Sequence, residues 1–312
     1  MSERGEDPGR YVYSALPDRP KLTWPGGKRI ALWIVDNHEY YELDPPITPT
    51  LEMWPRTRPD VLGYAWRDYG NRVGIWRVID MLDRHGLKGS ISLNVALCDH
   101  HPETAKACAE RGWEFFSHGV YNTRFHYDLS EADERRVFED VVETIERYSG
   151  TSPRGWLSPW LASSERTMDL LPEYGFTYTC DFYHDDQPFP MHVKSGRLIS
   201  MPYSMELNDV IAYLGQMTPA YYCRMIREAL DNLYAEAVRN DTSYVMCIPL
   251  HPFVVAQPHH LRVFDETLGY LTAHEGIWFS TGAEIAQYYL DHHYDTVAAA
   301  VAHEGGLEAP TA

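Results

Sequence analysis

The chain has 312 residues, of which 44% are hydrophobic and 23% are charged, and its formal net charge is -18. This composition is typical of a globular protein that forms one large α/β domain or two small ones. The negative charge argues against a nucleic acid or an anionic membrane as partner, because both bind clustered lysine and arginine. Five cysteines without a CxxC pair indicate neither a disulfide framework nor a zinc–cysteine site.

The N-terminus, Met-Ser-Glu-Arg-Gly-Glu-Asp-Pro, is polar and charged and does not have the apolar core of a signal peptide. The chain also has no run of about 18 apolar residues, which a membrane-spanning helix requires. We therefore expect a cytoplasmic protein in a reducing compartment.

Apolar runs that predict strands alternate along the chain with patterns that predict helices. The first strand is expected over residues 28–35, which are continuously apolar from Ile30 onward, as in a strand buried on both faces. A long irregular loop rich in Pro, Trp and Tyr is expected over 42–69. Further strands are expected over 89–97, 113–117, 154–157, 177–180, 198–202, 244–250 and 277–280. Helices are expected over 74–85, 102–111, 130–148, 166–174, 219–238 and 258–274, with a last helix after the final strand.

This alternation predicts a mainly parallel sheet. About seven such units without a break in composition favour a single α/β domain, a deformed (β/α)7 barrel over residues 28–294. Residues 1–27 are rich in Pro, Gly and charge, and we expect them to form an arm on the surface or on a neighbouring subunit. The Ala- and Gly-rich residues 295–312 are expected to form a flexible tail.

Polar side chains recur at the points where predicted strands end. The first strand is followed by Asn37 and Glu39, and the later ones by His118, Asn122, Ser158, Trp160, Asp181 and His251. In a parallel barrel such side chains converge at one mouth. Carboxylates and histidines together can polarise a carbonyl, activate water and protonate a leaving group. Any one of them can instead be structural, since Asp181 can cap a loop and His251 can shape a turn before a proline.

These strand ends resemble those of the NodB-type polysaccharide deacetylase superfamily over residues 28–290. The resemblance is closest to the branch that holds metal-independent allantoinases and cyclic imide hydrolases, and it implies the barrel of the NodB type. The segments that carry it are Asn37-His38-Glu39, SHGVYN at 117–122, RGWLSPW at 154–160, Asp181 with DDQP at 185–188, and IPLHP at 248–252.

The best-known members of the superfamily place two aspartates after the first strand and a His-x-x-x-His after the third. One aspartate and both histidines hold a divalent metal. Here the matching first-strand pair is Asn37 and Glu39, which share one face if the strand continues that far. An alternative register puts Asp36 there instead.

The second histidine of that pattern is replaced by Asn122, whose neutral amide oxygen is a poor ligand for zinc. His126 does not have the spacing of the family. The resemblance therefore implies that no cofactor is required. A divalent metal such as zinc, if one is used, would be held by Glu39, His118 and Asn122.

The resemblance implies hydrolysis of a C–N bond in a small cyclic amide or imide, as in allantoinases. Glu39 would orient or deprotonate water or bind a ring N–H, and His118 would polarise the carbonyl or relay a proton. His251, oriented by Asp181 or another acid, would protonate the leaving nitrogen. The residues expected to bind the substrate are Asn37, Asn122, Ser158, Trp160 and Asp185.

Two other functions remain open at this stage. One is a metal-dependent N-deacetylase of an acetylated sugar, and the other is a catalytically silent relative that binds a small ligand. In each case the partner is a small molecule or a glycan. The arm, the aromatic residues at 40–69 and the resemblance further predict a homo-oligomer, a dimer or a tetramer.

Overall fold

Nine strands form one curved sheet at the centre of the computed structural model, which describes residues 9–46 and 57–305. The strands are β1 Ile30–His38, β2 Ser90–Leu93, β3 Glu114–Ser117, β4 Gly155–Trp156, β5 Tyr178–Thr179, β6 Phe189–Met191, β7 Leu198–Ser200, β8 Tyr244–Leu250 and β9 Ile277–Phe279. Their order is β6-β7-β5-β4-β3-β2-β1-β8, and β9 pairs with the first half of β1. Every pair is parallel except β6–β7.

The two ends of this sheet approach each other. The amide of Val245 in β8 donates a hydrogen bond of 2.9 Å to the carbonyl of Asp186, just before β6. The sheet thus curls into a deformed barrel, as the sequence predicts. One strand, β6, was not expected, because it is three residues long and contains Pro190.

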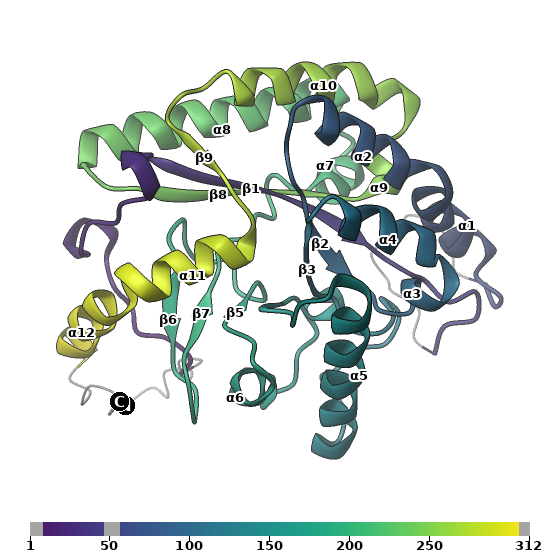
Figure 1. Ribbon diagram of the computed structural model, residues 1–312, viewed down its shortest axis with the longest axis horizontal. Helices are drawn as coiled ribbons and strands as arrows, with labels where there is room; N and C mark the ends of the chain where they lie inside the picture. Colours follow the sequence, from purple (N-terminus) through teal and green to yellow (C-terminus); the bar gives the residue numbers. More distant parts are fainter. Residues whose placement is uncertain (1–8, 47–56, 306–312) are drawn as a thin grey trace, which may run out of the picture.

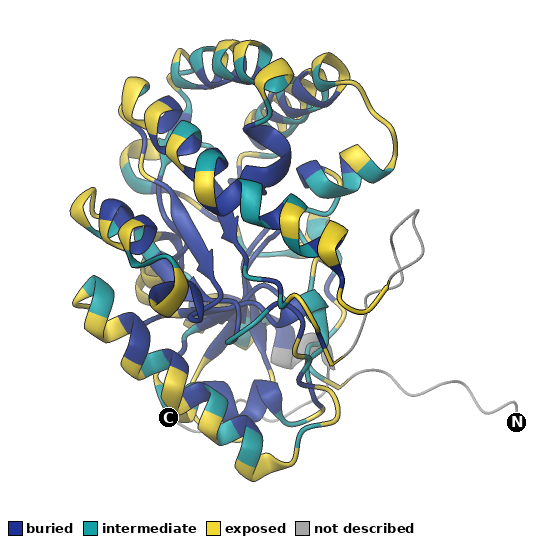
Figure 2. Cartoon of the chain, turned by 90° about the vertical axis from the view of Figure 1, so that its right-hand side faces the viewer, coloured by how far each residue is buried: buried dark blue, intermediate teal, exposed yellow. Residues whose placement is uncertain are grey.

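Helices cover the outside of the sheet, with α8 and α10 packed side by side (Figure 1). The outer faces of the helices are exposed, while the strands are buried (Figure 2). The helices are α1 Val61–Tyr69, α2 Ile75–Arg84, α3 Leu97–His100, α4 Pro102–Glu110, α5 Glu131–Ser149, α6 Thr167–Leu170, α7 Asp209–Leu214, α8 Pro219–Asn240, α9 Pro252–Val255, α10 Pro258–Thr272, α11 Gly282–His292 and α12 Tyr294–Gly305. A π-helical segment, Gly70–Gly74, joins α1 to α2.

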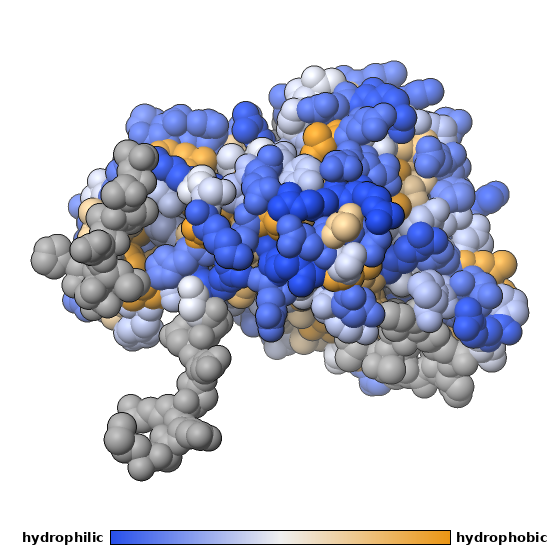
Figure 3. Space-filling view, turned by 90° about the horizontal axis from the view of Figure 1, so that it is seen from below, coloured by the Kyte–Doolittle hydropathy of each residue, from blue (hydrophilic) through white to orange (hydrophobic). Residues whose placement is uncertain are grey.

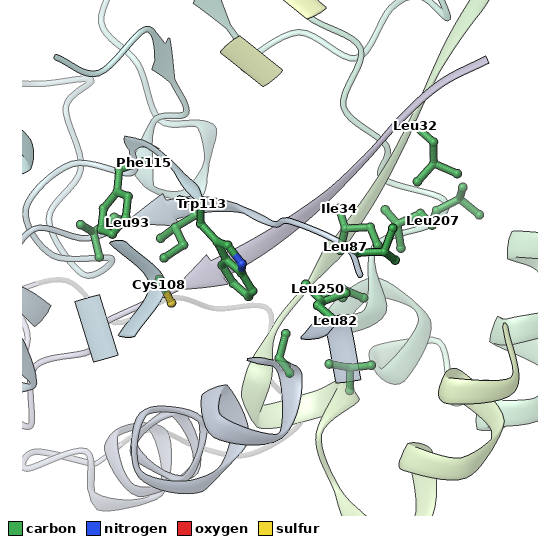
Figure 4. Close-up of a cluster of buried hydrophobic side chains, with 14 of the residues drawn as sticks. Leu32, Ile34, Leu82, Leu87, Leu93, Cys108, Trp113, Phe115, Leu207 and Leu250 are labelled. Atoms are coloured by element: carbon green, nitrogen blue, oxygen red, sulfur yellow. The ribbon is translucent and has the colours of Figure 1, made fainter. Parts of the chain in front are cut away.

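Alternate residues of β1 face two different cores. Ile30, Leu32 and Ile34 pack under the helices, in the cluster that Figure 4 shows in part. Ala31, Trp33 and Val35 face the barrel interior. Because side chains alternate along a strand, Asn37 points to the interior and Asp36 to the helices.

The loop, the tail and the arm of the sequence analysis are each ordered in part. The loop expected over 42–69 contains helix α1, while residues 47–56 lie outside the described part. The tail expected to be flexible forms helix α12 as far as Gly305. In the arm, Trp24 is buried and its Nε1 donates a 2.8 Å hydrogen bond to the carbonyl of Tyr244, so this part packs on the barrel of its own chain.

The face seen in Figure 3 is mainly hydrophilic, with small and separate apolar patches. Within residues 9–46 and 57–305, no helix has the length and apolar character needed to cross a membrane.

Candidate active site

A cavity of about 200 Å³ lies at the carboxyl ends of the central strands. Seven of the predicted site residues line it, and they come from the ends of β1, β3, β4 and β8: Asn37, Glu39, His118, Asn122, Ser158, Trp160 and His251. The parallel strands bring them together from a span of more than two hundred residues, in the way expected of strand ends in a barrel.

Glu39 stands between two histidines at the base of this cavity. Its Oε1 lies 3.5 Å from Nε2 of His118 and 3.4 Å from Nε2 of His251. Burial alone would raise the pKa of the Glu39 carboxyl. The charge of His251 and the contacts with both rings outweigh burial and hold this pKa well below its usual range. Glu39 is therefore a carboxylate at neutral pH.

His251 is held from its other side by Asp209, at the start of α7. The Nδ1 of His251 lies 2.7 Å from Oδ1 of Asp209, and its backbone amide donates to Oδ2 at 2.8 Å. Burial would lower the pKa of His251, but Glu39 and Asp209 raise it to about 10. The ring is thus an imidazolium at neutral pH, with a proton on Nε2 that faces Glu39.

His118 also faces Glu39 through Nε2, but the partner of its Nδ1 is a backbone carbonyl and not a carboxylate. Its Nδ1 lies 3.0 Å from the carbonyl oxygen of Leu157. A carbonyl only accepts hydrogen bonds, so Nδ1 carries a proton. In the neutral ring, Nε2 is then unprotonated and can accept a proton from a group in the cavity.

Two asparagines complete the polar wall. Asn37 forms hydrogen bonds with the Tyr203 hydroxyl, at 2.9 Å from Nδ2, and with the carbonyl of Leu250. The Nδ2 of Asn122 donates to the Tyr41 hydroxyl at 2.8 Å. Asn122 is only 2% exposed, and its Oδ1 has no hydrogen-bond partner among the described residues. This oxygen is a buried acceptor beside the cavity.

The loop after β4 places the side chain of Trp160 at the cavity, and its backbone conformation is unusual. Trp160 and Leu161 both have positive φ, 53° and 58°, which side chains with a Cβ rarely adopt. The loop is fixed by Asp181, which accepts hydrogen bonds of 2.7 Å from both the amide and the hydroxyl of Ser158. Strain of this kind is found where the surroundings impose a conformation, as at binding sites.

Two of the predicted residues do not line the cavity. Asp181 supports the Ser158 loop, and burial raises its pKa to about 6 against the hydrogen bonds from Ser158. The acid that orients His251 is Asp209 and not Asp181. Asp185 forms an ion pair with Arg19 at 2.7 Å and lines another hollow, so it does not contact a ligand in the cavity.

The structure also decides between the two registers at the first strand. Asp36 points away from the cavity, towards the helices, and its Oδ2 lies 3.2 Å from Nδ1 of His38. Glu39 is therefore the first-strand acid of the cavity. His126 is buried beside Trp156 and does not line the cavity.

The side chains at the cavity make a poor set of metal ligands. Among the described residues, no three His, Cys, Asp or Glu side chains are grouped so that they could hold a metal ion. Glu39 and His118 would need Asn122, whose oxygen is a weak zinc ligand, or His251, whose nitrogens are both protonated at neutral pH. The residues present do not fit a divalent metal.

Sequence reasoning missed several cavity residues. They are Tyr41, Trp66, Arg67, Tyr203, Met205, Asn208, Val210, Ile211, Leu214 and Phe253, together with Asp209 behind His251. A signal for α7 exists, because Asn208 is a favoured N-cap residue and accepts hydrogen bonds from the amides of Val210 and Ile211. No sequence pattern shows that this helix start meets the end of β8.

Comparison with known proteins identifies the class. The model of the polysaccharide deacetylase family matches residues 64–179. A peptidoglycan deacetylase of Helicobacter pylori is 23% identical over 252 residues, which cover 71% of this chain and 85% of that protein. The resemblance predicted from the sequence is confirmed: residues 64–179 match the polysaccharide deacetylase family.

Solved structures share the fold over almost the whole chain. The PuuE allantoinase superposes with a TM-score of 0.76 at 24% identity, covering 88% of this chain and 94% of that one. A Pseudomonas aeruginosa PAO1 protein named a probable polysaccharide deacetylase has a TM-score of 0.77 at 23% identity, with 88% and 95% covered. These identities establish the shared fold, whereas the substrate has to be argued from the site.

Proposed function

We propose that the protein hydrolyses a C–N bond of a small cyclic amide or imide without a metal ion. The observation that carries the proposal is the Glu39 carboxylate, whose Oε1 lies 3.5 Å from Nε2 of His118 and 3.4 Å from Nε2 of His251. One nitrogen can accept a proton and the other can donate one. Hydrolysis of an amide requires both steps.

The acid–base roles follow from the local electrostatics. The pKa of Glu39 is held far below its usual range, so its carboxylate is a weak base that orients water rather than deprotonates it. Nε2 of His118 takes the proton of the water as its oxygen attacks the ring carbonyl carbon. The Nε2 proton of His251 goes to the ring nitrogen as the C–N bond breaks. Glu39 contacts both rings, so its negative charge stabilises the imidazolium that forms on His118, and exchange with solvent restores the starting protonation of both rings.

Substrate recognition in this proposal uses the unpartnered acceptor of the cavity. The Oδ1 of Asn122 would accept a hydrogen bond from a ring N–H, which cyclic amides and imides carry next to the carbonyl. Such a bond would satisfy a buried polar atom whose desolvation otherwise costs about 1–3 kcal/mol. The indole Nε1 of Trp160 has no partner within the described residues either and can donate to a second ring carbonyl.

The size of the cavity favours one small ring over a polymer. A volume of about 200 Å³ is below the range of about 300–1,000 Å³ that is common for drug-sized ligands. The alternative is a metal-dependent deacetylase acting on an N-acetylated sugar, and one relative is named a peptidoglycan deacetylase. Its metal would need a third good ligand that the cavity does not provide.

The first test is turnover of a panel of hydantoin, dihydrouracil, succinimide, allantoin and an N-acetylglucosamine oligomer, each with and without EDTA. We expect at least one cyclic compound to be opened at a rate that EDTA does not change. Turnover of the acetylated sugar alone, lost in EDTA and restored by zinc, would overturn the proposal in favour of the deacetylase. No turnover of any compound, with tight binding of one, would favour the silent relative.

The second test replaces Glu39 and His118, whose side chains lie next to each other in the cavity. Glu39→Gln and His118→Asn should each lower kcat by about 10²–10⁴-fold, the usual scale for loss of a positioned acid, base or charge. The matched control is Glu110→Gln, because Glu110 is exposed on α4. Wild-type rates in folded Glu39→Gln protein would place the chemistry elsewhere.

A further inference from the structure

The cavity has two chemically different walls. The polar wall carries Glu39, His118, His251 and Asn122. Helices α1, α7 and α9 contribute apolar lining residues, here called the apolar wall, which are Trp66, Val210, Ile211, Leu214 and Phe253. The proposed chemistry uses only the polar wall, so the apolar wall needs an explanation of its own.

The apolar wall is not fully covered by the protein. Val210, Ile211 and Leu214 are all partly exposed, although they line a hollow. On the same helix, Ala212 is the side chain buried in the main hydrophobic core. Helix α7 therefore turns apolar side chains into the cavity as well as into the core. Removing them from water stabilises a complex in proportion to the apolar area covered.

The polar groups near this wall are already occupied or shielded. The Oδ1 of Asn208 accepts hydrogen bonds from the amides of Val210 and Ile211 and so caps α7. The Arg67 guanidinium is stacked against aromatic rings, 4.3 Å from the ring centre of Tyr41 and 4.8 Å from that of Trp66. A polar substituent on the substrate ring would have to form its hydrogen bond with Arg67.

We propose that the substrate ring carries a short apolar substituent, a branched alkyl or aryl group, that packs on Val210, Ile211 and Leu214. This inference deepens the proposed function and rests on it, since it assigns the part of the substrate that the reaction does not touch. It predicts a preference among ring substituents. Neither the fold nor the acid–base groups determine that preference. Helix α7 is then the element that determines specificity.

The test compares two substrates of equal shape. Allantoin is hydantoin with a ureido group on ring carbon 5, and 5-isobutylhydantoin has a branched alkyl group with the same number of heavy atoms there. We expect kcat/KM to be at least about 10-fold higher for the isobutyl compound, the scale of small differences in an apolar pocket. The measurement is the kcat/KM ratio of the two compounds under identical conditions.

Val210→Thr replaces a methyl group by a hydroxyl with little change of shape, and it should lower this ratio by about 5-fold. Ile211→Ala, which removes apolar area without adding a polar group, should also lower it. The matched control is Val238→Thr on the exposed face of α8, which should leave both rates unchanged, because Val238 is 52% exposed and does not line the cavity.

The outcomes separate the two proposals. If no ring compound is opened, the proposed function fails and the preference cannot arise. If rings are opened but allantoin is used as well as or better than 5-isobutylhydantoin, the chemistry stands and the apolar substituent is refuted, with Arg67 as the group that binds the ureido oxygen. If the kcat/KM ratio is unchanged in folded Val210→Thr and Ile211→Ala protein, α7 does not determine the specificity of the site.

Discussion

At the scale of single residues, Asp209 controls the protonation of the acid that faces the cavity. Its carboxylate contacts Nδ1 of His251 at 2.7 Å and adds to the effect of Glu39, so that the pKa of His251 is raised to about 10. The favourable pairing is complete below the pKa of an unfolded histidine, about 6.5, and is lost as pH rises through about 10. Activity that needs the imidazolium should therefore fall only in strongly alkaline solution.

Asp209→Asn should lower the pKa of His251, because an amide keeps the shape but removes a negative charge. We expect kcat at neutral pH to drop by about 10²–10⁴-fold. We also expect the alkaline limb of the kcat–pH profile to move to lower pH, which a general loss of folding would not cause. Asp80→Asn, at an exposed position on α2, is the control. An alkaline limb that stays in place in Asp209→Asn would refute this role.

At the scale of elements, the start of α9 is packed against the glycines that precede α2. A Cβ on Gly74 would lie 2.2 Å from the carbonyl oxygen of Pro252, the residue after His251. Gly74→Ala must therefore shift either its own segment or Pro252, the neighbour of His251. We expect a loss of about 1–3 kcal/mol in the free energy of unfolding, the usual cost of overpacking, together with reduced kcat.

The matched control for this change is Gly269→Ala in α10. A Cβ there meets only an ordinary contact at 3.6 Å from His85, so alanine should leave the protein unchanged or stabilise it by about 0.5–1 kcal/mol through its better helix propensity. Chemical denaturation of both variants, with kcat on the same preparations, distinguishes local displacement from general damage. Equal stability of the two variants would contradict the packing argument.

The elements that the sequence predicts well are those with a strong local pattern. The run of apolar residues in β8 matches the strand over its full length, Tyr244–Leu250, because a strand buried on both faces needs apolar residues throughout. The missed elements are short and depend on tertiary contacts. Helix α7 has six residues, too few to show a helical period, and the aromatic residues of α1 do not repeat at helical spacing.

The same distinction applies to the site. Glu39, His118 and His251 were predictable, because each follows a strand directly and parallel strands bring their ends together. Asp209 and the apolar wall reach the cavity from helices after long connections, and only the folded chain shows which helix meets which strand. The local pattern therefore predicts which strand-end side chains line the cavity, whereas the cavity residues contributed by helices depend on packing.

At the scale of the whole molecule, the arm and the barrel behave as one unit. Leu22 and Trp24 are buried, Arg10 pairs with Asp169 at 2.7 Å, and Arg19 pairs with Asp185. The aromatic side chain of Trp24 contributes to the inner core, so this part of the arm stabilises the barrel itself.

Assembly into a dimer or tetramer and a cytoplasmic location stay predictions. Light scattering checks the assembly by comparing the mass in solution with the 36.0 kDa of the monomer.

The buried carboxylate of Glu39 also bears on how the site is emptied after each turnover. A cyclic amide enters as a neutral molecule, but its opening creates a carboxylate in a hollow that already holds Glu39, in a protein of net charge -18. Like charges repel strongly where water is excluded. We expect the ring-opened product to inhibit weakly, with an inhibition constant at least about 10-fold above the KM of the ring. A product that binds as tightly as its ring would show that repulsion does not drive release.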